Sequence, residues 1–368
     1  MGSGSGQPLQ AIVIATSSGA PMHSARPKPL HVLCGRPMLR YVLDALSGAG
    51  VGDVSVVTGA AGERIAKRIM EDPPSVRLSW VEQRMEKGSA DAAQLALTEF
   101  DELDDAGDVL VLPADLPLLR SGTLERFVAA HRSSGSACTV LTGPALDAED
   151  TRARVQRDRH GRVRALVRHI DLIGDEGESD EVSLGVYCVR RSLLAPAARR
   201  VLPDLVDGRQ RMVDVPGVLA ASGHPVEAAS VVTEAGETGA IDDRVLLADA
   251  EAELRRRINR RWLEQGVTMV DPSHTYIDST VVLGTDVTLF PGTILQGRTV
   301  VADGCEIGPD TRLDRCTVGA NSVVEKTMAR LAAIGDDCRV GPFAAVEPGA
   351  ELGDGTITGP FYAAGAGD

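Results

Sequence analysis

A loop of small residues and an isolated carboxylate carry the residue types that phosphate chemistry needs. The loop ATSSGAPMHSARPK runs from Ala15 to Lys28 behind a short apolar segment. Its small side chains would let backbone N–H groups approach a polyphosphate, with Lys28 as the neighbouring cation. Asp115 follows the apolar segment VLVLP, a position that favours a metal ligand or a helix cap. Taken alone, the loop is equally typical of a plain strand-to-helix turn.

Two further segments place polar residues at helix starts. The segment GAIDDR, residues 239–244, has an acidic pair ahead of a long helical pattern. Taken alone, it is better interpreted as helix capping by Asp242 or Asp243. The segment EQRMEKGSADA, residues 82–92, is a Gly/Ser turn that opens a helix, and a capped helix start is again the simpler interpretation.

The elements that would position these residues alternate between strand and helix. The expected strands cover residues 10–15, 54–58, 109–113 and 182–190, and the expected helices cover residues 37–46, 62–70 and 89–100. This alternation predicts an α/β fold with a doubly wound, mostly parallel, Rossmann-like sheet. Because such sheets bind ligands at the carboxyl ends of their strands, loops 16–28 and 113–117 are candidate sites.

An aliphatic residue recurs every six positions in the last third of the chain. A helix would show a period of 3.6 and would tolerate few of the intervening glycines and prolines. Three hexapeptides make one triangular coil of a left-handed parallel β-helix, so the repeat predicts a short β-helix rather than an irregular Gly-rich tail. The repeat residues are Leu283, Leu289, Leu295, Val301, Ile307 and Leu313, then, after an interruption, Ile334, Val340, Val346 and Leu352.

These patterns predict a domain order along the chain. We expect a disordered tail at 1–9, a nucleotidyltransferase domain at 10–243, an amphipathic connecting helix at 244–266 and the β-helix at 267–368.

Charge and cysteine content narrow the function classes. The 368-residue chain has a net charge of −14, which argues against nonspecific nucleic-acid binding because a phosphate backbone attracts basic surfaces. Six dispersed cysteines without CxxC spacing predict buried free thiols in a reducing compartment. The first apolar segment is too short for a signal or membrane span, so a cytoplasmic location without membrane attachment is expected.

Taken together and in this order, the segments resemble one family, the bifunctional N-acetylglucosamine-1-phosphate uridyltransferases and glucosamine-1-phosphate acetyltransferases. The resemblance runs from about residue 10 to about residue 350. It rests on AIVIATSSGAPMHSARPKPLHVLCGRPM, EQ…GSA, VLVLPADLPLL, RVRALVRHID, EVSLGVYCV, IDDR and WLEQGVTMVDPSHTYID.

The resemblance implies a catalytic set and a metal. The family's metal-binding Asp and Asn fall on Asp115 and Asp242, and Asp is an equally competent oxygen ligand for Mg²⁺. The family's pyrophosphate-facing Lys falls on Lys28. These residues imply attack of a 1-phosphate oxygen on the α-phosphorus of a nucleoside triphosphate, with release of pyrophosphate.

The nucleotide site departs from the family. Its loop LAAGxGTRM reads IATSSGAPM here, so one Gly becomes Ser17 and the phosphate-binding Arg becomes Pro21, with Arg26 close by as a substitute. The base-reading GTG becomes EKG, where a carboxylate at Glu86 could accept from guanine, so the expected donor is GTP or UTP. The expected nucleotide-binding residues are Ala15, Ser17, Ser18, Gly19, Arg26, Glu82, Glu86, Lys87, Gly88 and Ser89.

The sugar site departs further. The family's sugar-binding Glu becomes Arg168, an Asn becomes Ser183 and a Thr becomes Val213, with Gly185 kept beside them. Loss of these polar groups predicts an acceptor other than N-acetylglucosamine 1-phosphate. A related sugar or cyclitol 1-phosphate is expected, as in validamycin-type guanylyltransferases acting on valienol 1-phosphate.

The remaining expectations concern the β-helix and the rival functions. No His follows His274 and the coils are few, so acetyl transfer is not expected, whereas a homo-oligomer (dimer or trimer) is. Two rivals stay open: a pseudoenzyme that binds nucleotide or a partner without turnover, and UTP-dependent transfer to N-acetylglucosamine 1-phosphate. A purely structural β-helix protein would leave the first 240 residues unexplained.

Overall fold

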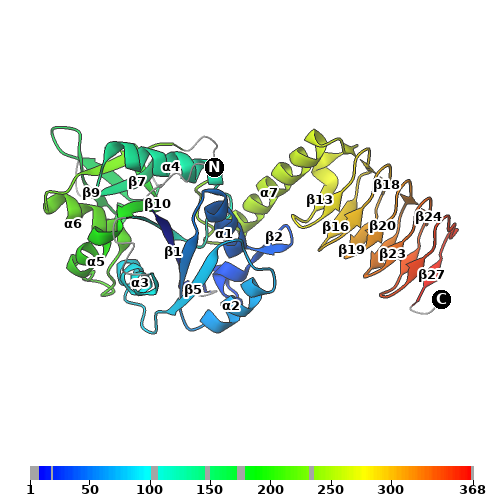
Figure 1. Ribbon diagram of the computed structural model, residues 1–368, viewed down its shortest axis with the longest axis horizontal. Helices are drawn as coiled ribbons and strands as arrows, with labels where there is room; N and C mark the ends of the chain where they lie inside the picture. Colours follow the sequence, from blue (N-terminus) through cyan, green and yellow to red (C-terminus); the bar gives the residue numbers. More distant parts are fainter. Residues whose placement is uncertain are drawn as a thin grey trace, which may run out of the picture. The chain divides into compact units, whose positions relative to one another are not determined.

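A nine-stranded sheet organises the first part of the chain in the computed structural model (Figure 1). Its main path is β11–β7–β10–β6–β1–β4–β5; off this path β8 pairs with β10, and β9 pairs with β8. Strands β6, β1, β4 and β5 are parallel to one another, and β10 runs antiparallel between β6 and β7. The strands are β1 (Leu9–Ala15), β4 (Asp53–Thr58), β5 (Arg77–Glu82), β6 (Asp108–Pro113), β7 (Cys138–Pro144), β8 (Arg154–Arg157), β9 (Val163–Val167), β10 (Glu181–Arg190) and β11 (Val226–Ala229).

Helices cover both faces of this sheet, which confirms the doubly wound α/β fold. Helices α1, α2 and α4 contribute to one buried cluster with Val13, and α3, α5 and α6 contribute to a second with Ile12. Because neighbouring side chains of a strand point to opposite faces, β1 supplies both cores. The helices are α1 (Met38–Gly48), α2 (Gly62–Met70), α3 (Ser89–Ala96), α4 (Ser121–Ser134), α5 (Arg191–Arg200), α6 (Val215–Ala221) and α7 (Arg244–Glu264).

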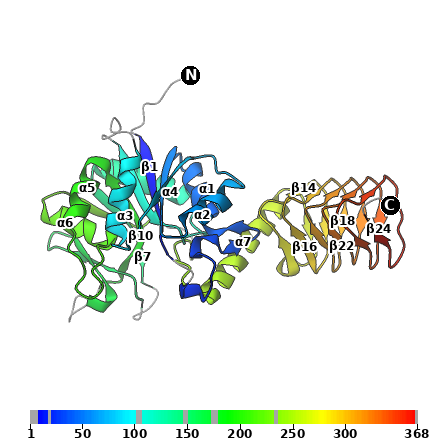
Figure 2. The ribbon, with the colours of Figure 1, turned by 90° about the horizontal axis from the view of Figure 1, so that it is seen from below.

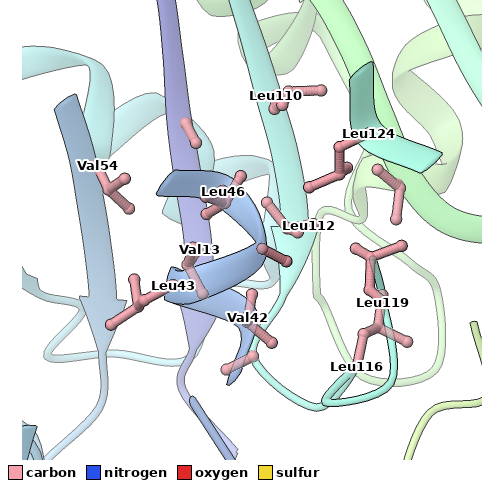
Figure 3. Close-up of a cluster of buried hydrophobic side chains, with 14 of the residues drawn as sticks. Val13, Val42, Leu43, Leu46, Val54, Leu110, Leu112, Leu116, Leu119 and Leu124 are labelled. Carbon is pink, nitrogen blue, oxygen red and sulfur yellow. The ribbon is translucent and has the colours of Figure 1, made fainter. Parts of the chain in front are cut away.

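The first core fixes the strands that lead to the candidate site. Figure 3 shows Val42 and Leu46 of α1 close to Val13 of β1 and Leu112 of β6. Leu112 is 1% exposed, and it lies directly before the end of β6. The core packing of β6 therefore fixes the point at which the following loop, which carries Asp115, begins.

The last part of the chain forms a stack of β-helix coils with three parallel sheets (Figure 2). The sheets follow the orders β12–β15–β18–β21–β24, β13–β16–β19–β22–β25–β27 and β14–β17–β20–β23–β26. All ten hexad residues are buried, and Leu295 stacks in register on Leu313. The strands are β12 (Thr268–Met269), β13 (Thr275–Ile277), β14 (Val282–Leu283), β15 (Thr288–Leu289), β16 (Thr293–Gln296), β17 (Val300–Val301), β18 (Glu306–Ile307), β19 (Arg312–Asp314), β20 (Thr317–Val318), β21 (Val323–Val324), β22 (Met328–Arg330), β23 (Ala333–Ile334), β24 (Arg339–Val340), β25 (Ala345–Val346), β26 (Glu351–Leu352) and β27 (Ala363–Ala364).

The interruption in the hexad is not a break in the β-helix. Val318, Val324 and Ala329 are buried, and each stacks on a residue of the preceding coil. The steps from Leu313 to Val318, from Val324 to Ala329 and from Ala329 to Ile334 are five residues instead of six, so these corners are each a residue shorter and the six-residue period is lost. Arg315 at the first of these corners has φ 55°, a left-handed conformation suited to a tight turn.

The structure describes residues 8–17, 20–100, 107–145, 150–171, 179–231 and 236–365. The chain divides into two units, Met1–His31 with Pro37–Leu246 and Val32–Arg36 with Leu247–Asp368. All six cysteines are buried and outside any disulfide, as expected from their spacing. No helix in the described ranges has the length and apolar character needed to cross a membrane.

Candidate active site

Three charged side chains from distant parts of the first unit meet at one point. The Lys28 Nζ atom lies 2.5 Å from Asp115 Oδ2 and 2.7 Å from Asp242 Oδ1. The Lys28 side chain is 4% exposed, the Asp115 side chain 15% and the Asp242 side chain 69%. Burial disfavours the charged ammonium, but the Asp115 and Asp242 carboxylates outweigh that effect and raise the pKa of Lys28. Lys28 therefore stays a cation at neutral pH.

The topology of the sheet brings these residues together. Asp115 lies two residues beyond β6, and Lys28 opens a short 3₁₀ turn in the loop that follows β1, the strand paired with β6. Asp242 lies just ahead of α7, and the Ile241 N–H donates to the Asp115 carbonyl oxygen at 3.1 Å. The carboxyl ends of two adjacent parallel strands thus carry two of the three residues, as expected for a ligand site in such a sheet.

The acidic pair fits a magnesium ion. Asp115 Oδ1 is buried and has no hydrogen-bond partner within the residues that the structure describes. A buried carboxylate oxygen without a partner is costly, which favours a ligand at that atom. The described residues gather no group of three or more His, Cys, Asp or Glu side chains as metal ligands. Mg²⁺ is commonly held by one or two carboxylates plus phosphate oxygens and waters, so Asp115 and Asp242 suit it.

The same two loops contribute to a pocket of about 600 Å³. Pro113 at the end of β6 lines it, two residues before Asp115, and Thr16 and Ala20 line it from the loop that leads to Lys28. A pocket of this volume is large enough for a nucleotide-sized ligand. Its lining is Ile14, Thr16, Ser17, Ala20, Gln83, Glu86, Gly88, Ser89, Val111, Leu112, Pro113, Gly185, Tyr187, Arg209, Arg211, Met212 and Val213.

The expected nucleotide-binding residues divide into three groups. Ser17, Glu86, Gly88 and Ser89 line the pocket. Ala15, Arg26, Glu82 and Lys87 are not among its lining residues, and Ala15 is buried at the end of β1. Ser18 and Gly19 lie outside the described residues.

Gln83 is a lining residue that the sequence analysis did not select. It directly follows β5 and is 4% exposed, whereas the neighbouring Glu82 is exposed at the end of the strand. The Gln83 Nε2 atom donates to the Gly88 carbonyl oxygen at 3.0 Å and to Asp91 Oδ2 at 2.8 Å. Because both donors of the amide are engaged, the Gln83 side chain is fixed in the pocket wall.

The pocket wall has a second part, the loop at residues 204–211, which is hydrogen-bonded to the turn at residues 86–90. The Ala90 N–H donates to the Gln210 carbonyl oxygen at 2.9 Å, and the Gln210 N–H donates to the Lys87 carbonyl oxygen at 2.7 Å. Gly88 has φ 102°, and any side chain there would collide with the Gln210 backbone. Arg209 forms an ion pair with Glu86 across the same contact. The two halves of the pocket wall are therefore joined directly.

The expected acceptor-site residues lie near the loop at residues 204–211. Gly185 and Val213 line the pocket, whereas Ser183 is buried and its Oγ accepts from the Gly185 N–H at 3.3 Å. Arg168 does not line the pocket. Its guanidinium lies 2.6 Å from Asp204 Oδ2, in the loop that carries Arg209 and Arg211.

Asp204 links Arg168 to the pocket wall. Arg211, which lines the pocket, lies 3.1 Å from the same Asp204 oxygen. The Val206 N–H and the Arg168 guanidinium lower the pKa of Asp204 to about 2. Arg209 and Arg211 are thus lining residues that the sequence analysis missed; the only signal was their position in GRQRM, directly before Val213.

Comparison with known proteins identifies the family. Residues 11–235 match the model of the MobA-like NTP transferase domain. The chain is 36% identical over 351 residues to the bifunctional protein GlmU of Heliobacterium modesticaldum, which covers 95% of this chain and 75% of that protein. It is 37% identical to GlmU of Streptomyces avermitilis, over 96% of this chain and 73% of that protein. For GlmU of Kineococcus radiotolerans the identity is 39%, over 96% and 71%. The chain therefore belongs to the GlmU family and carries its nucleotidyltransferase domain.

Proposed function

We propose that the chain transfers a nucleotidyl group from a nucleoside triphosphate to a sugar or cyclitol 1-phosphate, with Mg²⁺ as cofactor and pyrophosphate as the second product. The observation that carries this proposal is the Lys28 ammonium between the Asp115 and Asp242 carboxylates, at the carboxyl edge of the sheet. Membership of the GlmU family supports the reaction class. The rival, a pseudoenzyme, would have no need to keep a buried cation between two carboxylates.

Each residue of the cluster has a role in that reaction. An oxygen of the acceptor phosphate forms a bond to the α-phosphorus, and the bond from that phosphorus to the β-phosphate oxygen breaks, releasing pyrophosphate. Lys28 neutralises charge on the phosphates, and Asp115 and Asp242 hold the metal. Mg²⁺, when bound, supplies further neutralisation of the phosphate oxygens.

We propose an acceptor other than N-acetylglucosamine 1-phosphate. The support is the pair of guanidinium groups, Arg209 and Arg211, in the wall beside Val213, and the tether of Arg168 to Asp204 outside the lining. Arginines offer several N–H donors and no acceptor, so this wall suits an oxygen-rich ligand, and Val213, which offers no polar group to an acetamido sugar, is what disfavours N-acetylglucosamine 1-phosphate. The second candidate is UTP-dependent transfer to N-acetylglucosamine 1-phosphate, which identity of 36–39% to GlmU proteins supports equally well.

GTP is the donor that we propose to test first. Glu86 lines the pocket with a carboxylate, which can accept from the N1–H and N2–H₂ groups of guanine, whereas uracil lacks that pair of donors. Arg209 already pairs with Glu86, but a carboxylate has about four lone-pair sites and can accept from both partners.

A pyrophosphate-release screen tests the proposal. It crosses GTP, UTP, CTP and ATP with a panel of sugar and cyclitol 1-phosphates that includes N-acetylglucosamine 1-phosphate. We expect the fastest release with GTP and an acceptor other than N-acetylglucosamine 1-phosphate. Preference for UTP with N-acetylglucosamine 1-phosphate would establish the second candidate, and nucleotide binding without release from any pair would establish the pseudoenzyme.

A further inference from the structure

Glu237 is a buried carboxylate outside the three-residue cluster and the pocket. It precedes Asp242 by five residues and is 0% exposed. Its Oε1 atom accepts from the Arg120 backbone N–H at 2.9 Å. Its Oε2 atom has no hydrogen-bond partner within the part of the chain that the structure describes. A carboxylate is rarely buried without a compensating interaction, so its place in the fold requires an explanation.

The compensation comes from helix α4, which starts at Ser121. The first N–H groups of a helix lack partners and carry a partial positive charge, so a carboxylate at that end is stabilised. The residue that caps α4, Arg120, makes no side-chain capping hydrogen bond. Glu237, from a loop 117 residues away in the sequence, accepts instead from the backbone N–H of Arg120, the first of the unpaired donors at this end of the helix. Its negative charge is therefore favourable only when the loop lies against the start of α4.

The loop is attached to the Asp115 segment at a second point. The Ile241 N–H donates to the Asp115 carbonyl oxygen at 3.1 Å, and Ile241 is 4% exposed. Glu237 thus contacts Arg120, and Ile241 contacts Asp115. Asp242 follows Ile241 directly, so these two contacts hold the backbone from which its carboxylate reaches Lys28, 2.7 Å away.

The segment that receives the loop is itself rigid. Leu116 and Leu119 are buried, and Figure 3 shows them in the same cluster as Leu124 of α4. The Leu119 N–H donates to the Leu116 carbonyl oxygen at 3.2 Å, and the Ala114 N–H donates to the Ile14 carbonyl oxygen of β1 at 3.0 Å. The segment 114–120 is held by the core, and the loop 236–242 is attached to it. The positions of Asp115 and Asp242 relative to each other are therefore fixed.

We propose that Glu237 is a positioning residue for the metal site: by capping α4 it holds the 236–242 loop so that Asp242 faces Asp115. This inference rests on the proposed function, because it assigns Glu237 to the metal site of that reaction. Glu237 is 0% exposed and does not line the pocket, so its effect runs through Asp242. Residues that orient metal ligands typically change metal affinity by 10- to 100-fold when they are removed.

Two variants and one matched control test the proposal in the full-length protein. Glu237→Ala removes the cap, and Glu237→Gln keeps an acceptor oxygen for the Arg120 N–H but removes the charge. Asp108→Asn is the control, because Asp108 is also a buried carboxylate, in this case ion-paired with Arg132, and lies at the end of β6 opposite Asp115. The readouts are the Mg²⁺ concentration for half-maximal pyrophosphate release and the rise in melting temperature on adding MgCl₂ alone.

We expect Glu237→Ala to raise the half-saturating Mg²⁺ concentration by about 10-fold or more and to lose the Mg²⁺-induced thermal shift. Glu237→Gln should fall between Glu237→Ala and the parent, and it carries the test if Glu237→Ala does not fold. Asp108→Asn should keep the parent's Mg²⁺ dependence even if it melts earlier. An unchanged Mg²⁺ dependence in both Glu237 variants, or the same change in the control, would overturn the inference. A parent protein that releases no pyrophosphate would instead contradict the proposed function.

Discussion

Replacing Lys28 with methionine tests the charge cluster most sharply. Methionine retains much of the lysine stem, so the change removes the ammonium from between Asp115 and Asp242 and leaves most of the packing. The two carboxylates then face each other without a cation. Asp242 is 69% exposed and can be hydrated, whereas Asp115 is 15% exposed and cannot be hydrated fully.

The magnitude follows from this asymmetry. Breaking a fully buried ion pair costs about 3–5 kcal/mol, and solvent around Asp242 reduces that figure, so we expect Lys28→Met to lower the free energy of unfolding by about 2 kcal/mol. The effect on rate should be larger, because removal of one group that stabilises transition-state charge costs about 10²- to 10³-fold.

Urea denaturation and steady-state pyrophosphate release measure the two effects. Lys67→Met is the matched control, since Lys67 is an exposed residue of α2 outside the pocket. The control should match the parent in both assays. A Lys28→Met protein that keeps more than about half of the parent rate would refute the role of the ammonium.

Three further predictions concern the ligand, the β-helix and pH. Asp242→Asn keeps an oxygen ligand and should stay within about 10-fold of the parent kcat, whereas Asp242→Ala should lose more than about 100-fold in the same assay. Leu295→Ala removes a fully buried side chain of a β-helix coil and should lower the free energy of unfolding by about 2–5 kcal/mol, measured in urea, with pyrophosphate release unchanged. Because the pKa of Lys28 is raised, its ion pairs are complete below its ordinary pKa and are lost only as pH rises through the raised value. The rate profile should therefore show no loss from Lys28 between about pH 7 and about pH 9, and a descending limb there that disappears in Lys28→Met would contradict this.

Periodic features of the fold could be predicted from the sequence. The strand–helix alternation and the hexad both arise from side chains that must be buried at fixed intervals, and α2 begins and ends at the predicted residues. The interrupted stretch of the hexad could not be read in the same way. There the coils keep their stacking but shorten their corners, so Val318 and Ala329 fall out of the six-residue period.

In the candidate site, too, some residues could be predicted from the sequence and others could not. Lys28 and Asp115 lie in loops after parallel strands, and general rules for such sheets select those loops. Asp242 was selected only through the resemblance, since an acidic pair before a helix is more simply a cap. Arg209 was missed because its place depends on a contact between distant loops, the ion pair with Glu86, 123 residues away. No local pattern in the sequence encodes that contact.

The most direct test of the central claim is the Mg²⁺ dependence of pyrophosphate release by the parent protein and by Asp115→Ala. The measurement uses the best nucleotide and acceptor pair from the screen, with and without Mg²⁺. If Asp115 holds the metal, release requires Mg²⁺ in the parent and is abolished in Asp115→Ala. Undiminished Mg²⁺-dependent release by a folded Asp115→Ala protein would contradict the account.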